Sequence, residues 1–116
     1  MDVETKPLWT TTREAMGHTW SVNLYPNDVV LGSAGALGSE SAGSVLLRNQ
    51  HIAILAAGTP AYKDETLLHE LLEMAVVKAE ISMDHRDIER LSGLLFAFLR
   101  GFGLWCDFPW PDREGT

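Results

Sequence analysis

The sequence predicts an α+β domain in which a small, mainly antiparallel sheet from the N-terminal half packs on two core helices from the C-terminal half. Residues 19–25 alternate between apolar and polar side chains, and residues 44–48 and 51–55 form two short apolar runs. Residues 66–80 and 85–100 instead repeat their apolar side chains with the helical period. With 116 residues, 46% of them apolar, the chain has enough material for a single domain around one core.

The first half of the chain predicts strands joined by turns and a loop. Residues 1–17 are polar and are expected to form a tail or an irregular lead-in. Trp20, Val22 and Leu24 fall on one face of a half-buried strand over residues 19–25. Residues 26–28 then predict a turn, residues 29–31 a short strand and the Gly/Ser/Ala-rich residues 32–44 a loop.

The two apolar runs that follow allow two interpretations. Residues 44–48 and 51–55 form either a tight hairpin around Asn49 and Gln50 or one long strand with a bulge. Residues 58–60, Gly-Thr-Pro, close this β-rich half, which spans residues 18–58.

The second half predicts two helices over residues 63–100. The first begins at Lys63 or Asp64, since Asp64 is a good N-cap residue, and runs to about residue 80. Asp84 can cap the second helix, which runs to about Arg100 and ends at the glycines that follow. Its predicted buried stripe, with Phe98 on one edge, consists of Ile88, Leu91, Leu95 and Leu99.

Residues 101–116 form a tail that carries three large aromatic side chains within seven residues, 104–110. We expect this tail to pack back across the domain; a strip that docks a partner is the alternative interpretation.

Charge and composition exclude several classes of partner. The net charge is −7 and the chain has no basic run, so neither a nucleic acid nor an anionic membrane surface is expected as a partner.

A single cysteine, Cys106, excludes an intrachain disulfide and a cysteine-rich zinc site. No apolar run approaches the roughly 18 residues of a membrane span, and residues 1–4 do not resemble a signal peptide. A cytoplasmic location is therefore expected.

The first helix carries ionisable side chains between two apolar flanks. At about 100° per residue, Glu65, His69, Glu73 and Glu80 form one narrow stripe, and Glu70 projects about 100° to its side. Ionisable groups on a core helix cost several kcal/mol each unless they are paired. A bound cation would pair with one imidazole and several carboxylates, whereas the alternative interpretation is a solvated Glu/His stripe.

The spacing of these residues predicts a metal site. His69 and Glu73 stand four residues apart, so both can reach one ion, and Glu70 can reach a water bound to that ion. This geometry is that of HExxH zinc helices, in which the glutamate is the general base. His85 leans toward the core and would complete a set of two histidines and one carboxylate. Such a set suits Zn²⁺, and also Fe²⁺ or Mn²⁺; Asp87 or Glu89 are alternatives for the third ligand.

Residues 65–72, which read ETLLHELL, and the later run from His85 through IERL at residues 88–91 resemble the small zincin-like proteins common in bacteriophages and prophages. Those proteins are similar to ImmA/IrrE-type metallopeptidases. The resemblance implies His69 as a metal ligand, Glu70 as the catalytic base and His85 as the third ligand. It also implies a peptide or protein substrate along an edge strand near residues 51–55, and a host-cytoplasmic location.

One ligand position departs from the family pattern. Glu73 stands where the family has histidine, which gives HELLE in place of HELLH. The sequence therefore predicts a metal-dependent hydrolase with a variant site, and its alternative is a catalytically inactive zincin-like module that binds or regulates.

Overall fold

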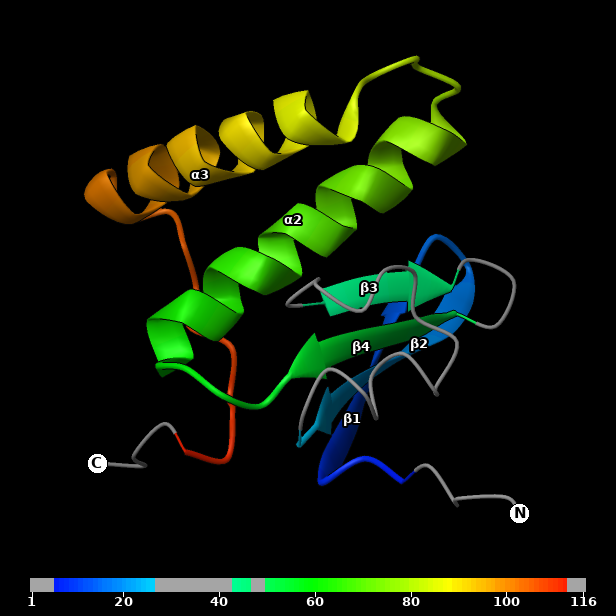
Figure 1. Ribbon diagram of the computed structural model, residues 1–116, viewed down its shortest axis with the longest axis vertical. Coiled ribbons are helices and arrows are strands. Elements are labelled where there is room, and N and C mark those ends of the chain that lie inside the picture. Colours follow the sequence, from blue (N-terminus) through cyan, green and yellow to red (C-terminus); the bar gives the residue numbers. More distant parts are fainter. Residues whose placement is uncertain (1–5, 27–42, 47–49, 113–116) are drawn as a thin grey trace. The chain divides into compact units, whose positions relative to one another are not determined.

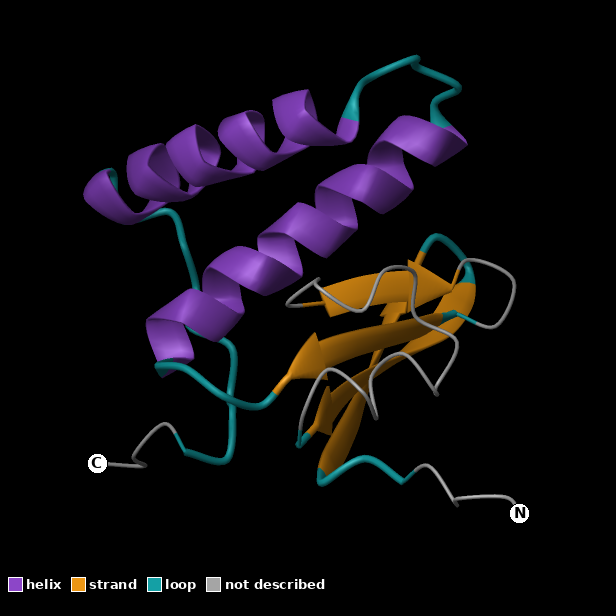
Figure 2. Cartoon of the chain, viewed as in Figure 1, coloured by secondary structure: helices purple, strands orange, loops and turns teal. Residues whose placement is uncertain are grey.

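The computed structural model describes residues 6–26, 43–46 and 50–112. The chain forms two compact units, Met1–Gly58 and Thr59–Thr116, and each is described by itself below. The strands belong to the first unit and both helices to the second (Figure 2), which confirms the predicted α+β class. Within the described ranges, neither helix has the length and apolar character needed to cross a membrane.

The first unit contains a four-stranded sheet with the strand order β1-β2-β4-β3 (Figure 1). Its strands are β1 (Trp9–Ala15), β2 (His18–Tyr25), β3 (Gly43–Leu46) and β4 (His51–Leu55). β1 pairs with β2 and β3 pairs with β4 in antiparallel fashion, whereas β2 and β4 run parallel. The sheet is therefore mainly antiparallel, as predicted.

Strand β1 corrects the prediction of an irregular lead-in over residues 1–17. It pairs with β2 along its whole length, and its last residue, Ala15, faces His18 across a two-residue turn. Met16 and Gly17 both have positive φ, 57° and 78°, as a type I′ turn requires. Three consecutive threonines at 10–12 favour extended backbone because they are β-branched, and pairing with β2 supplies their hydrogen bonds.

The β3–β4 pairing confirms the hairpin interpretation of residues 44–55 and rules out one long bulged strand, since Leu46 faces His51. The same pairing shows that the predicted edge strand near residues 51–55 is wrong. β4 is hydrogen-bonded to β3 on one side and to β2 on the other, so it has no free edge. The turn, short strand and loop predicted over residues 26–44 fall largely outside the described residues.

The two faces of the sheet differ in polarity. One carries the buried apolar side chains of Trp20, Val22, Leu24, Ile52 and Ile54, which confirms the apolar face predicted for β2. The strand is not half-buried as predicted, because Asn23 and Tyr25 on its other face are buried too. The other face holds a hydrogen-bonded polar group. There, Asn23 Nδ2 donates to the Ile52 carbonyl over 3.1 Å, and the Tyr25 hydroxyl lies 3.1 Å from His51 Nε2. Burial lowers the pKa of His51 and raises that of Tyr25, so both are neutral near pH 7.

Helix α2 (Pro60–Lys78) begins several residues earlier than predicted. Thr59 is its N-cap: the Thr59 side chain accepts a hydrogen bond from the backbone N–H of Tyr62, and Pro60 occupies the first helical position. Asp64 is not a cap. It is completely buried in the second turn, where it accepts hydrogen bonds from the indole nitrogens of Trp105 (3.2 Å) and Trp110 (2.7 Å).

These bonds show that the aromatic tail packs back onto the second unit, as predicted. The tail leaves the end of α3 and returns to the first turns of α2 (Figure 1). Trp110 is buried, and Lys63, itself 1% exposed, pairs with Asp112 over 2.7 Å. The first half of α2 is thereby fixed by the tail, whereas its last turn is exposed, with Val77 at 57%.

Helix α3 (His85–Gly101) follows Asp84, which occupies the N-cap position as predicted, and it lies alongside α2 (Figure 1). Its buried side chains are Ile88, Ser92 and Phe96. Leu91, predicted to be buried, is 42% exposed. The buried face is thus rotated by roughly 55° from the stripe that apolar periodicity indicates, and Phe96 packs edge to face on Trp105 of the tail.

Candidate metal centre

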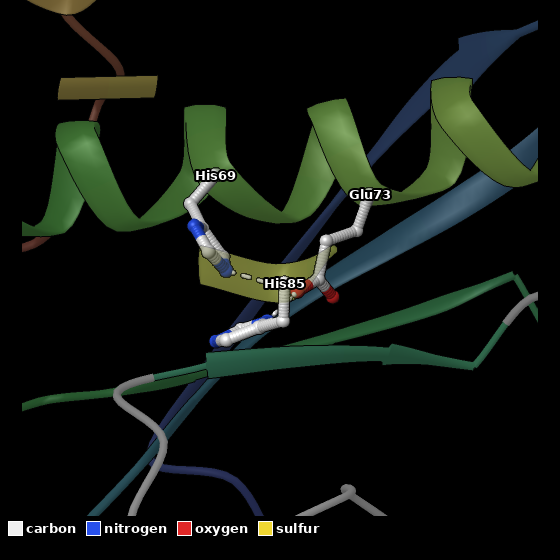
Figure 3. Close-up of side chains that lie close together, drawn as sticks. All are labelled: His69, Glu73 and His85. Carbon is white, nitrogen blue, oxygen red and sulfur yellow. Dashed lines mark hydrogen bonds and ion pairs between the residues drawn. The ribbon is translucent and has the colours of Figure 1, made fainter. Parts of the chain in front are cut away.

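The candidate ligands come from the two helices of the second unit. His69 and Glu73 stand one turn apart on α2, with side chains 15% and 26% exposed. His85 is the first residue of α3 and its side chain is 63% exposed. Because α3 lies alongside α2, the start of α3 brings His85 to the stripe that carries the other two (Figure 3).

The three side chains converge on a common point. One potential ligand atom from each of His69, Glu73 and His85 lies within 4.8 Å of the other two. Glu73 Oε2 is the shared atom: it lies 3.0 Å from His69 Nε2 and 2.6 Å from His85 Nδ1. The two imidazole rings stand edge to face, with centroids 5.0 Å apart. The convergence predicted from the sequence is confirmed, and metal binding there stays a prediction.

Contacts to Glu73 Oε2 link the three groups. The hydrogen bond to Glu73 raises the pKa of His69, and the charges of nearby glutamates add to this effect, while partial burial opposes it. The hydrogen bond from His69 in turn lowers the pKa of Glu73. Both shifts favour an imidazolium–carboxylate pair, in which the proton on Nε2 occupies the space between ligand atoms that a cation would take.

The donor set fits a divalent transition metal. Two imidazoles and one carboxylate form a common set in catalytic zinc sites, and the same set suits Fe²⁺ or Mn²⁺. Tetrahedral coordination at about 2.0–2.1 Å separates ligand atoms by roughly 3.3 Å. The observed separations from Glu73 Oε2, 3.0 and 2.6 Å, are shorter, and the whole set lies within 4.8 Å, so side-chain adjustments are needed to surround an ion. Because Glu73 and His85 are partly exposed, rotation about their side-chain bonds can supply these adjustments.

Glu70 is a buried carboxyl group beside the candidate ligands in the sequence. It is 2% exposed, and its Oε1 has no hydrogen-bond partner within the part of the chain that the structure describes. Burial, and secondarily the negative charge of Glu73, raises the pKa of Glu70 to about 8, against a smaller opposing effect of His69. An unsatisfied buried carboxyl oxygen costs about 1–3 kcal/mol, which is the kind of cost that functional sites tolerate.

The alternatives for the third ligand do not join the group. Asp87 and Glu89 are both exposed, and neither belongs to the set of converging ligand atoms. Glu89 acts at longer range, where its charge contributes to the raised pKa of His69. His85 is therefore the third member of the candidate centre.

One neighbour of the centre was missed at the sequence level. Ser92 on α3 is 2% exposed, and its Oγ lies 3.5 Å from Nδ1 of His69, the ring nitrogen that faces away from Glu73. In the sequence, the only signal for Ser92 is its position on the apolar side of the second predicted helix. A serine is usually exposed to solvent, so this signal alone does not indicate a role in the centre.

Comparison with known proteins gives no relative for this chain: no protein-family model, curated protein or solved structure matches it.

Proposed function

We propose that the chain is a metal-dependent hydrolase of the zincin type that acts on a peptide or protein. The observation that carries the proposal is the convergence of His69, Glu73 and His85, whose ligand atoms lie within 4.8 Å of one another. The resemblance of the α2 sequence to zincin-like phage proteins supports it. In this proposal Zn²⁺ is the resident metal, with Fe²⁺ or Mn²⁺ as alternatives, and the protein works in the cytoplasm of a phage-carrying host.

The role of each residue follows from its position. His69, Glu73 and His85 would hold the ion, which supplies Lewis acidity and lowers the pKa of a water molecule. Glu70 would accept a proton from the attacking water and pass it to the leaving amine. Oε1 of Glu70, which has no partner among the described residues, could take such a proton. The positive charge of a bound ion would favour the ionised form of Glu70 that can accept it.

Two substitutions test the proposal. General-base catalysis typically contributes 10²- to 10⁴-fold in rate, so Glu70→Gln should remove hydrolysis of a broad peptide library while leaving zinc content unchanged. Glu73→His restores the HELLH pattern and replaces an anionic ligand with a neutral one, which makes the ion a stronger Lewis acid. We expect Glu73→His to bind zinc and to hydrolyse peptides faster than the wild type.

The matched control is Glu14→Gln, which removes one carboxylate from an exposed position on β1. It should change neither zinc content nor hydrolysis. If the wild type and Glu73→His both hold stoichiometric zinc and both leave the library uncut, the hydrolase proposal is wrong.

A second candidate function is a zincin-like module that binds or regulates without catalysis. One observation favours it: Glu73 Oε2 bridges the two imidazoles directly, so the site satisfies its own polar groups without an ion. Under this proposal the protein binds its peptide or protein partner, with or without zinc, but never cleaves it, and Glu70→Gln leaves binding unchanged.

A further inference from the structure

We infer that Ser92 is a positioning residue for the candidate metal centre: it accepts a hydrogen bond from Nδ1–H of His69 and so holds Nε2 toward the ion. The inference rests on the proposed function, because it assigns a role within that same centre. It concerns a serine that belongs neither to the ligand set nor to the HELLE pattern.

The first observation is the place of Ser92 in the helix pair. It lies on the buried face of α3 between Ile88 and Phe96, where the other side chains are apolar, yet it is only 2% exposed. The neighbouring Gly93 also faces α2, since a Cβ added to it would be in ordinary van der Waals contact with Glu65 Oε2 at 3.5 Å. A hydroxyl so placed must find its partners within the helix pair.

The second observation concerns the direction of the hydrogen bond. A serine hydroxyl has one hydrogen to donate, and Ser92 Oγ donates it to the backbone carbonyl of Glu89 over 2.9 Å. In the inferred arrangement the same oxygen accepts a hydrogen bond from His69 Nδ1, which lies 3.5 Å away, and Nδ1 carries a proton.

A proton on Nδ1 of His69 determines the state of Nε2, the nitrogen that would bind the ion. A neutral imidazole with its proton on Nδ1 presents the lone pair of Nε2, and Nε2 is the nitrogen that faces Glu73 Oε2 at 3.0 Å. Ser92 thus selects the tautomer and ring orientation that metal binding needs. Groups that orient a ligating histidine typically change metal affinity by 10- to 100-fold. Since 3.5 Å is long for a hydrogen bond, we expect the lower end of that range for Ser92.

The experiment compares Ser92→Ala with a variant that loses an equivalent hydroxyl elsewhere. Thr66 on α2 donates its Oγ1 hydrogen to the carbonyl of Tyr62 over 2.9 Å, as Ser92 does to Glu89, and it is also buried. Thr66→Val removes that bond and leaves all three candidate ligands unchanged. Alanine is a better helix former than serine, so Ser92→Ala should fold, which the melting temperature of the metal-free protein checks.

Zinc affinity, measured by competition with a chromophoric chelator, should fall about tenfold in Ser92→Ala and stay within twofold of wild type in Thr66→Val. A second readout is the long-range ¹H–¹⁵N spectrum of the zinc-loaded protein. In the wild type it should show zinc on Nε2 of His69 and a proton on Nδ1, and in Ser92→Ala this single pattern should be lost.

The outcomes separate this inference from the proposed function. If the wild type does not bind zinc, the metal centre and the role of Ser92 are both wrong. If the wild type binds zinc but Ser92→Ala binds it equally well, or if His69 coordinates through Nδ1, only the role of Ser92 is overturned.

Discussion

Glu70→Gln should stabilise the metal-free protein, by an amount that depends on pH. In the folded protein the pKa of Glu70 is about 8, against 4.5 for an unperturbed glutamate. Below pH 4.5 both the folded and the unfolded state hold the proton, so burial of the carboxyl group carries no ionisation cost. Between pH 4.5 and about 8 only the unfolded state releases the proton, and the free energy of unfolding therefore falls as the pH rises.

The size of the effect follows from the same values. Each pH unit above 4.5 lowers the free energy of unfolding by about 1.4 kcal/mol until the folded-state pKa is reached, which gives about 3 kcal/mol at pH 7. Glutamine has the shape of the protonated acid and does not titrate, so Glu70→Gln removes this loss. The melting temperature at pH 7 should rise by roughly 10 °C, with little change at pH 4.5.

Urea unfolding with chelator present, at half-unit steps from pH 4.5 to 8, measures the difference between the two proteins. Glu14→Gln removes the same charge from an exposed strand position and controls for net charge. A stability difference between Glu70→Gln and wild type that is the same at every pH would refute the reasoning, because it would show that Glu70 does not keep its proton on folding.

Three further predictions concern the metal and the end of α2. If zinc binds only the folded state, free zinc at a hundredfold excess over Kd raises the free energy of unfolding by about 2.7 kcal/mol. Chelator should therefore lower the melting temperature of the zinc-loaded protein, and His69→Ala should abolish that shift. Zinc affinity, followed by calorimetry from pH 5 to 8, should rise with pH because the ion displaces the proton that a raised pKa keeps on His69; a flat profile would contradict this. Glu80 follows the C-cap of α2 with φ of 59°, where the N–H of Ile81 donates to the carbonyl of Val76. Glu80→Gly should therefore stabilise the protein by about 1 kcal/mol in thermal melts, whereas Ala79→Gly, at an ordinary helical φ of −83°, should destabilise it.

The sequence by itself determined the features that depend on local geometry. The pairing of His69 with Glu73 needed only the helical period, because residues four apart share a face wherever the helix lies. The strand around Val22 follows from alternation. The residue type of Asp84 predicts the start of α3, although its side chain makes no capping hydrogen bond. In each case the signal lies within a few residues of the feature that it predicts.

Local signals failed where distant partners decide the outcome. The threonine run of β1 was read as an irregular lead-in because its hydrogen bonds come from β2. The family resemblance implies an edge strand near residues 51–55, whereas parallel pairing with β2 makes β4 internal. Asp64 has the residue type of a cap, but the indole donors of Trp105 and Trp110, more than 40 positions away, satisfy it inside the second unit.

The candidate centre depends on both local sequence signals and tertiary packing. Two of its ligand positions are set by one turn of α2, but the choice of His85 over Asp87 or Glu89 depends on how α3 lies against α2. The same packing turns Ser92 inward and leaves Leu91 42% exposed. Apolar periodicity shows only which face of a helix is hydrophobic, whereas the buried face is the one that a neighbouring element covers. Ser92 can lie on the buried face of α3 because its hydroxyl has hydrogen-bonding contacts with Glu89 and His69.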